Sequence, residues 1–206
     1  MATITAEKPA NEAARLKALR KYQLLDTPED GAFDRITALA STIFKTPIAI
    51  ISLVDSDRIW FKSHHGLDVR QINRDPGLCA SAILSDDLYV IENARDDPRS
   101  LANPLVAGDF GLMFYAAAPL RTDENHNLGT LCILDKEPRA FSQEERKMLG
   151  LLGEIVMHEM NLRLAVRETA LNVKHLTSEI SDHLANACEQ INNGSDTEIL
   201  PYLKAS

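Results

Sequence analysis

Two apolar runs separated by a short polar connector form the most regular pattern in the chain. They occupy residues 113–120 and 128–134, and the polar connector spans residues 121–127. Each run has the length and the boundaries of a β-strand. A short polar connector usually joins antiparallel neighbours, so the pattern predicts a β-hairpin over Met113–Asp135 in the centre of a sheet.

Neither strand of this hairpin alternates apolar with polar residues. Because side chains alternate across a strand, Tyr115 points to one face of the sheet and Phe114 to the other, and the three alanines at 116–118 continue the alternation. Both faces therefore need a cover, one supplied by helices and the other by loops or a ligand. The alanines leave room for the close approach of a packed helix or of a small molecule, and the pattern leaves both alternatives open.

The rest of the first 111 residues reads as short elements in a clear order. Helical periodicity covers 11–25 and again the stretch up to Lys45, where Asp26 or Thr27 is expected to be the N-cap. Strands are expected at 47–55 and 59–66, a polar connection at 67–76, a short helix at 78–84, a brief strand at 88–91 and a long loop-rich segment at 93–111. Ordered loops of that length are usually functional, so we expect the last segment to lie over the central sheet.

A long helix follows the hairpin. Ser142 and Glu145 have the spacing of a capping box, and helix propensity continues to Asn192–Gly194, with Gly150 and Gly153 as weak positions. A narrow apolar stripe follows this helix and is otherwise surrounded by charged residues; it consists of Leu162, Val166, Ala170, Val173, Leu176, Ile180, Leu184, Ala187 and Ile191. Such a stripe cannot stabilise a lone helix in water, which leaves a parallel dimeric coiled coil or a folded-back hairpin.

Composition narrows the class of protein. The chain has 206 residues, of which 45% are hydrophobic and 25% charged, and a formal net charge of −8, values ordinary for a globular domain. The absence of a basic cluster argues against nucleic-acid binding, and no apolar run approaches the roughly 20 residues that a membrane span needs. The N-terminus lacks the apolar core of a signal peptide, so we expect a cytoplasmic protein that binds neither nucleic acid nor membrane.

The cysteines and histidines carry no metal-binding pattern. Cys79, Cys132 and Cys188 are isolated from one another and from histidines at ligand spacing, which is typical of reduced thiols. His175 and His183 lie on the long helix, and the sequence around His183 is faintly similar to a phosphoacceptor helix of sensor kinases. Too few residues follow for an ATP-binding domain, so a degenerate phosphotransfer or docking helix is the alternative that remains.

The order of these elements resembles the GAF domain, a ligand-sensing module of bacterial signalling proteins such as histidine kinases and diguanylate cyclases. The resemblance covers about residues 12–165 and is carried by several stretches in the same order: 15–41, 48–67, 79–83, 96–106, 114–120 and 128–145. It implies an α+β fold with a central antiparallel sheet, helices on one face, a ligand pocket roofed by loops on the other, and a long exit helix that transmits the ligand state.

The resemblance also allows the residues of this chain to be compared with those that known GAF ligands require. GAF domains that bind a bilin attach it through a cysteine shortly before the strand that matches 113–120, and residues 103–112 here contain neither Cys nor His. Some GAF proteins reduce free methionine sulfoxide with nearby cysteines, and the candidates for such a pair here are Cys79 and Cys132, which would meet across the pocket. A cyclic nucleotide would need polar groups such as Arg74, Arg95 and Arg99 to converge on it.

Together these observations predict a flexible N-terminus at 1–10, a GAF domain at 11–160, a signalling and dimerisation helix at 161–193 and a tail at 194–206. We expect a small-molecule sensor, not an enzyme, that dimerises through the C-terminal helix and signals to a separate protein whose identity the sequence leaves open. The alternative is a thiol-redox enzyme acting on a small metabolite. No cofactor or metal is assigned. The expected ligand-binding residues are Tyr115, Thr130, Cys132, Phe110 and Cys79.

Overall fold

The computed structural model describes residues 7–97, 100–101 and 103–203, which form helices and one sheet in the predicted order. Contacts divide the chain into two compact units, Met1–Asn161 and Leu162–Ser206. The first unit holds the sheet. The elements are α1 (Glu12–Tyr22), α2 (Gly31–Phe44), β1 (Ile48–Val54), β2 (Arg58–His65), β3 (Gln71–Asn73), α3 (Leu78–Ala82), β4 (Tyr89–Ile91), α4 (Pro104–Ala107), β5 (Phe114–Arg121), β6 (Asn127–Asp135) and α5 (Gln143–Leu203).

The six strands form one antiparallel sheet in the order β3-β2-β1-β6-β5-β4. The predicted hairpin is confirmed as β5 and β6, in which Ala117 pairs with Cys132. Strand β6 also pairs with β1, so that it lies in the middle of the sheet. Both faces of these strands are buried, as their continuous apolar sequences predict.

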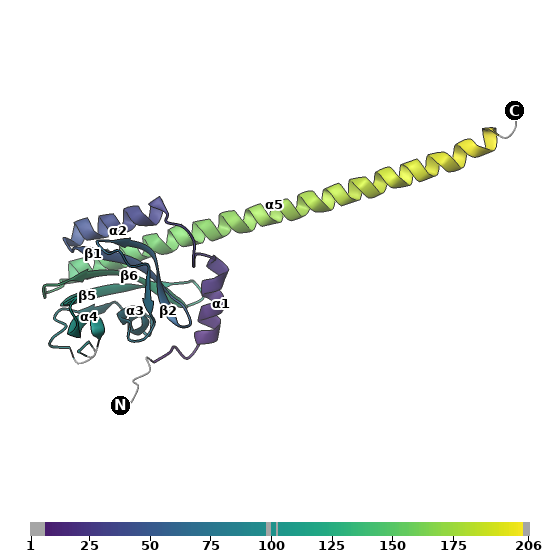
Figure 1. The fold of residues 1–206 in the computed structure, drawn as a ribbon. Coiled ribbons are helices and arrows are strands. Elements are labelled where there is room, and N and C mark those ends of the chain that lie inside the picture. The colour runs from purple at the N-terminus through teal and green to yellow at the C-terminus, as the bar shows by residue number, and fades with distance from the viewer. Residues whose placement is uncertain (1–6, 98–99, 102, 204–206) are drawn as a thin grey trace. The chain divides into compact units, whose positions relative to one another are not determined.

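Helices cover one face of the sheet. Figure 1 shows α2 and the first turns of α5 on the side of the sheet opposite α3 and α4. The approach of α5 to β5 is close because small residues meet there: a Cβ built on Gly153 would lie 3.1 Å from the Cβ of Ala118. Gly153, a weak position for helix propensity, is therefore a point of close approach between this helix and the sheet.

The other face carries a large hydrophobic cluster. It contains residues that alternate with the helix-facing ones, among them Ile50 on β1, Tyr115 on β5 and Cys132 on β6, and it is covered by α3, α4 and their connections. The segment 93–111 lies over the sheet, as expected, because Leu105 and Phe110 pack against this cluster. The alanines of β5 thus serve both faces, Ala118 against α5 and Ala117 within the loop-covered cluster.

Two expectations for the N-terminal half are wrong in detail. Helix α2 begins at Gly31, not after Asp26 or Thr27, since Asp30 has extended backbone angles and its carboxylate accepts a hydrogen bond from the amide of Ala32 at 3.0 Å. The polar connection 67–76 contains β3, which pairs with β2 through Ile72 and Ile59. A strand with one apolar residue gives no periodic signal.

Helix α5 begins with the predicted capping box. The Ser142 hydroxyl accepts from the Glu145 amide at 3.2 Å, and the Glu145 carboxylate accepts from the Ser142 amide at 2.8 Å. The helix includes the whole of the predicted signalling helix, residues 161–193.

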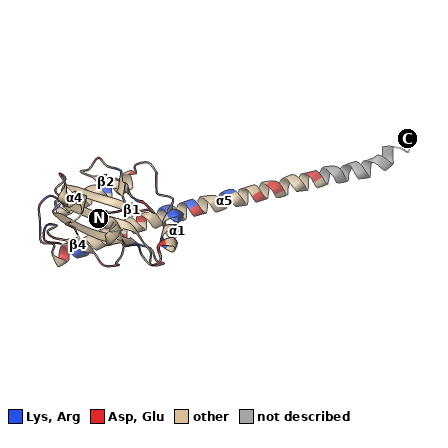
Figure 2. Cartoon of the chain, turned by 60° about the horizontal axis from the view of Figure 1, so that its bottom comes forward, with Lys and Arg blue, Asp and Glu red and all other residues tan. Residues whose placement is uncertain are grey.

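The second unit consists of the remainder of α5. Acidic and basic side chains are distributed along its described part (Figure 2). The large apolar side chains of the predicted stripe are each between 57% and 62% exposed, namely Leu162, Val166, Val173, Leu176, Ile180 and Leu184. These apolar side chains are therefore exposed along the described part of α5.

Candidate functional site

An apolar cavity of about 120 Å³ lies between the sheet and the loops that cover it. Strands β1, β2, β5 and β6 form its floor, and α3, α4 and the connections around β3 form its roof. The lining residues are Ile50, Phe61, Leu67, Val69, Ile72, Leu78, Cys79, Leu105, Phe110, Tyr115, Cys132 and Leu134. Val69, at the β2–β3 end of the cavity, is 42% exposed, whereas Cys79, Tyr115 and Cys132 are buried.

The structure brings together four of the five predicted ligand-binding residues. Tyr115, Cys132, Phe110 and Cys79 all line the cavity. Thr130 points to the same face of β6 but does not line the cavity, because its hydroxyl is hydrogen-bonded to the hydroxyl of Ser52 at 2.9 Å on the neighbouring strand. Thr130 and Ser52 thus form a buried hydroxyl pair.

Tyr115 and the two cysteines supply the polar atoms of the cavity. The phenol of Tyr115 donates a hydrogen bond to the sulfur of Cys79 at 3.3 Å, and the thiol of Cys132 lines the same cavity. The bond from Cys132, with further bonds from Ser52, Tyr115 and Thr130, outweighs burial and lowers the pKa of Cys79 to about 6. Burial, together with its bond to Cys79, raises the pKa of Cys132 well above its ordinary value.

Polar contacts hold the roof of the cavity at its margin. Arg74, which precedes α3, is buried and forms an ion pair with Glu12 of α1 and a hydrogen bond to the carbonyl of Asp55 at 2.8 Å. Burial opposes ionisation of Glu12, yet hydrogen bonds from Arg15 and Arg74 outweigh it and lower the pKa of Glu12 to about 2. Asn103, which precedes α4, donates to the carbonyl of Pro76.

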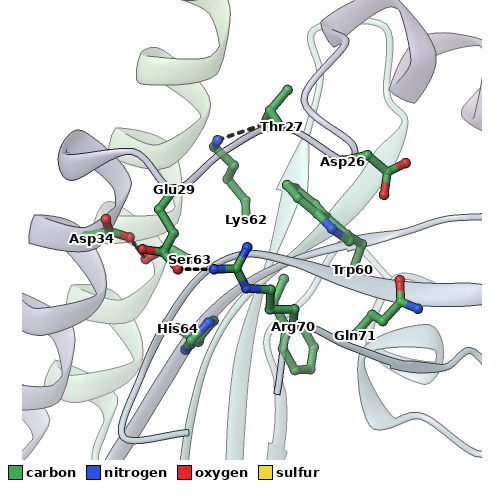
Figure 3. A pocket seen from close by; sticks show the side chains of 11 residues that line it. Asp26, Thr27, Glu29, Asp34, Trp60, Lys62, Ser63, His64, Arg70 and Gln71 are labelled. Atoms are coloured by element: carbon green, nitrogen blue, oxygen red, sulfur yellow. Dashed lines mark hydrogen bonds and ion pairs between the residues drawn. The ribbon is translucent and has the colours of Figure 1, made fainter. Parts of the chain in front are cut away.

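A larger hollow of about 550 Å³ lies elsewhere, between the α1–α2 connection and strand β2. Its charged groups already contact protein partners (Figure 3): Lys62 donates to the Thr27 hydroxyl at 2.8 Å, and Arg70 pairs with Glu29 at 2.6 Å. Lys62 also lies over the rings of Phe33 and Trp60. We therefore interpret this hollow as a polar joint between the connection and the sheet, and the apolar cavity as the candidate site.

The other candidate residues do not converge on the cavity. Arg74 is occupied by Glu12, Arg95 is exposed, and Arg99 lies outside the described residues. His175 is exposed on α5, where its Nε2 lies 3.5 Å from a Glu179 carboxylate oxygen, and His183 is exposed on the same helix. Among the residues that the structure describes, no group of three or more metal-ligating side chains forms a site.

Most residues of the roof were not predicted from the sequence. Leu67, Val69 and Ile72 lie in the polar connection, and Leu105 lies in the long loop-rich segment. Isolated apolar residues in polar loops carry no periodic signal. Only their position next to a strand that is apolar on both faces could have indicated that they cover it.

Comparisons with known proteins agree on the family. The family model of the GAF domain matches residues 28–160. A cyclic di-GMP phosphodiesterase of Pseudomonas aeruginosa is 40% identical over 154 residues, which are 74% of this chain; the chain spans only 26% of that relative's length. No described helix is long and apolar enough to cross a membrane.

Solved structures show the same fold at low identity. The GAF domain of an Acinetobacter phosphoenolpyruvate-protein phosphotransferase has a TM-score of 0.56 and 17% identity, covering 75% of this chain and 98% of that one. A free methionine-R-sulfoxide reductase of Neisseria meningitidis has a TM-score of 0.54 and 18% identity, covering 82% and 99% of the two chains. At this identity the likeness concerns the fold alone.

Proposed function

The chain belongs to the GAF domain family of signalling proteins, and on that premise we propose that it is a sensor of a small, largely apolar molecule. We propose further that it dimerises through α5 and signals to a separate partner protein. The observation that carries the proposal is the loop-covered cavity with Tyr115 and Cys79 as its hydrogen-bonding groups.

The size and lining of the cavity favour one class of ligand. An apolar cavity of about 150 Å³ in another protein stays dry and binds benzene, so about 120 Å³ suits a molecule of roughly that size. A cyclic dinucleotide is much larger and would need partners for its phosphates, which this lining does not offer. The ligand class is therefore a small aliphatic or aromatic molecule with one group that hydrogen-bonds to Tyr115.

Strand β5 offers a short route from the cavity to α5. Tyr115 faces the cavity, while Ala118, three residues further along the same strand, contacts Gly153 of α5. A ligand that displaces Tyr115 shifts β5, and the tight Ala118–Gly153 contact passes this shift to the helix. The signal is then a change in population between two arrangements of the paired helices.

The apolar stripe supports dimerisation of α5. Leu162, Val173 and Leu184 lie 11 residues apart, and Ile180 and Leu176 fall on the same side of such a repeat. An 11-residue repeat matches a nearly straight or slightly right-handed coiled coil. The stripe is too narrow and too exposed to stabilise a single helix, which is why we propose a second copy as its cover.

Native mass spectrometry of the chain purified from its source cells tests the ligand proposal. The expected result is a retained small molecule that is lost on denaturation and is absent from a Leu105→Phe variant, in which the added ring fills the cavity. A chain that retains nothing, and whose melting temperature no small apolar compound raises, would contradict it.

Cys188 tests the dimer, because it falls on the same 11-residue repeat as Val166 and Thr177. In a parallel, in-register pair the two Cys188 thiols meet, so mild oxidation should give a covalent dimer that Cys188→Ser abolishes. Asp182→Cys in the Cys188→Ser background is the matched control, since Asp182 lies on the opposite side of the helix. A monomer in sedimentation would favour the folded-back alternative, and a dimer without the cross-link would exclude the parallel register.

A thiol-redox activity on a small metabolite is the second candidate function, favoured by the meeting of Cys79 and Cys132 in the cavity. The Cys132→Ala substitution separates the two candidates. An enzyme would lose its turnover, whereas a regulator would keep its fold, its dimer and its ligand. The assay is reduction of methionine sulfoxide and related small sulfoxides by the wild type and the variant.

A further inference from the structure

Beyond the sensing of a reversible ligand, we propose that Cys79 and Cys132 form a hydroperoxide-responsive thiol pair that closes to a disulfide inside the cavity. The inference does not depend on which ligand the cavity takes. It rests on two buried thiols and a phenol that the fold brings together from three separate elements.

The two thiols are placed by elements that pack directly on each other. Cys79 is the second residue of α3, and Cys132 lies in the middle of β6 with Ile50 and Ala117 as its strand partners. Both are free cysteines, 5% and 0% exposed, and both line the same cavity. Because both thiols line one cavity of about 120 Å³ and α3 contacts β6, a disulfide between them joins α3 to the sheet across this cavity.

The surroundings give the two sulfurs different roles. Cys79 accepts the hydrogen bond of Tyr115 and is contacted by Cys132, and these bonds favour its thiolate. Cys132, whose pKa burial raises, keeps its proton. Since the thiolate is the nucleophile, Cys79 attacks first and Cys132 resolves.

The chemistry balances with a hydroperoxide as the oxidant. The Cys79 thiolate attacks one peroxide oxygen and the O–O bond breaks, which gives a sulfenic acid on Cys79 and an alkoxide that takes up a proton and leaves as the alcohol, or as water if the oxidant is hydrogen peroxide. The Cys132 sulfur then attacks the Cys79 sulfur. The S–S bond forms, the S–O bond breaks, and the hydroxyl leaves as water with the Cys132 proton. Both sulfurs are oxidised and the peroxide is reduced.

The cavity supplies what this reaction needs from its site. Its volume of about 120 Å³ suits a small oxidant, and its apolar lining suits an organic hydroperoxide as well as hydrogen peroxide. The disulfide would tie α3 to β6 and convert the Cys79 sulfur, which accepts the Tyr115 hydrogen bond, into a neutral and weaker acceptor. Oxidation and ligand binding would therefore compete for the same space.

The test uses the full chain with Cys188→Ser, which removes the exposed thiol and its intermolecular cross-links. The reduced protein is treated with hydrogen peroxide or cumene hydroperoxide, its remaining thiols are alkylated, and its peptides are mapped by mass spectrometry. The expected product joins the peptides of Cys79 and Cys132 and is reopened by a dithiol reductant. Free, fully alkylated Cys79 and Cys132 after treatment would overturn the proposal.

Single variants assign the order of attack. With Cys132→Ser, the reaction should stop at a Cys79 sulfenic acid that dimedone traps, and with Cys79→Ser, Cys132 should stay reduced. Tyr115→Phe should slow the reaction severalfold while its circular dichroism stays unchanged. In the unsubstituted pair, the rate should level off near pH 6 to 7 because the pKa of Cys79 is about 6. A rate that keeps rising to the ordinary thiol pKa of about 8.5, or a reactive Cys132 in Cys79→Ser, would overturn it.

Discussion

Strands β5 and β6 present apolar side chains to both faces of the sheet, yet the two faces are covered by different means. On one face α5 packs closely on β5 where Gly153 meets Ala118, so closely that a Cβ built on Gly153 would lie 3.1 Å from the Cβ of Ala118. On the other face, short helices and connections span a cavity of about 120 Å³. A regular helix can bring a row of small residues into contact with a strand, whereas connections of changing direction leave space between their apolar residues.

The helix cover and the loop cover also differ in the interactions that hold them to the sheet. The α5 face depends on apolar packing of Leu149, Val156 and Met160, all of which are buried. The loop cover is anchored at its margin by polar contacts such as the Glu12–Arg74 ion pair and the bond from Asn103 to Pro76. We infer that the face covered by α5 passes a movement of the sheet to the helix. We infer further that the loop-covered face admits a ligand.

The largest effect is expected on the packed face. Gly153→Leu should lower the free energy of unfolding by about 2–3 kcal/mol, because its side chain has no space beside Ala118. Gly150→Ala is the control: a Cβ there meets only Leu88 at 3.9 Å, so the gain in helix propensity should stabilise the protein by about 0.5–1 kcal/mol. Urea unfolding measures both, and equal stability of Gly153→Leu and the wild type would remove the contrast between the faces.

A smaller, pH-dependent effect is expected at the margin of the loop cover. The folded-state pKa of Glu12 is about 2 against an ordinary 4.5, so its ionisation stabilises the fold above pH 4.5, and this contribution is lost as the pH falls from 4.5 toward 2. Allowing for solvent screening, Glu12→Gln should cost about 1–2 kcal/mol at pH 7 and progressively less below pH 4.5.

The exposed Arg70–Glu29 pair is the control for this second prediction. Its side chains are 67% and 64% exposed, so Glu29→Gln should change the unfolding free energy by less than about 0.5 kcal/mol. Urea unfolding at a series of pH values compares the variants. If Glu12→Gln lowered the unfolding free energy as much in acid as at pH 7, the ionised carboxylate of Glu12 would not be what holds the roof.

The smallest effect on stability is expected inside the cavity. Leu105→Phe adds volume next to empty space, so the unfolding free energy should change by less than about 1 kcal/mol. Binding of benzene, measured by calorimetry, should nevertheless be lost. A variant as destabilised as Gly153→Leu would show that the loop-covered face is as tightly packed as the other.

The sequence predicted the fold where its elements are long and periodic. Strands β1, β5 and β6 were found because their apolar runs are continuous, and α5 because of its capping box and stripe. Strand β3 was missed because Ile72 alone is apolar there. The contact of Gly153 with Ala118 was missed as well. A glycine in a helix indicates close packing only when the strand that it packs against is known.

For the site, strand alternation was enough to place Tyr115 and Cys132 on one face of the sheet, and both line the cavity. The same argument included Thr130, which instead pairs with Ser52, because alternation fixes the face but not the position along the strand. The roof residues could not be found, since which connection folds over which strand is decided by tertiary contacts such as Arg74 with Glu12.

The most direct test is a methyl NMR titration of the chain with benzene. We expect nuclear Overhauser contacts between benzene and the methyl groups that line the cavity, those of Ile50, Ile72, Leu105 and Leu134. We expect none to Leu131 or Ile133 on the helix-covered face. Contacts to Leu131 or Ile133, or no contact at any methyl group, would contradict the claim that only the loop-covered face admits a ligand.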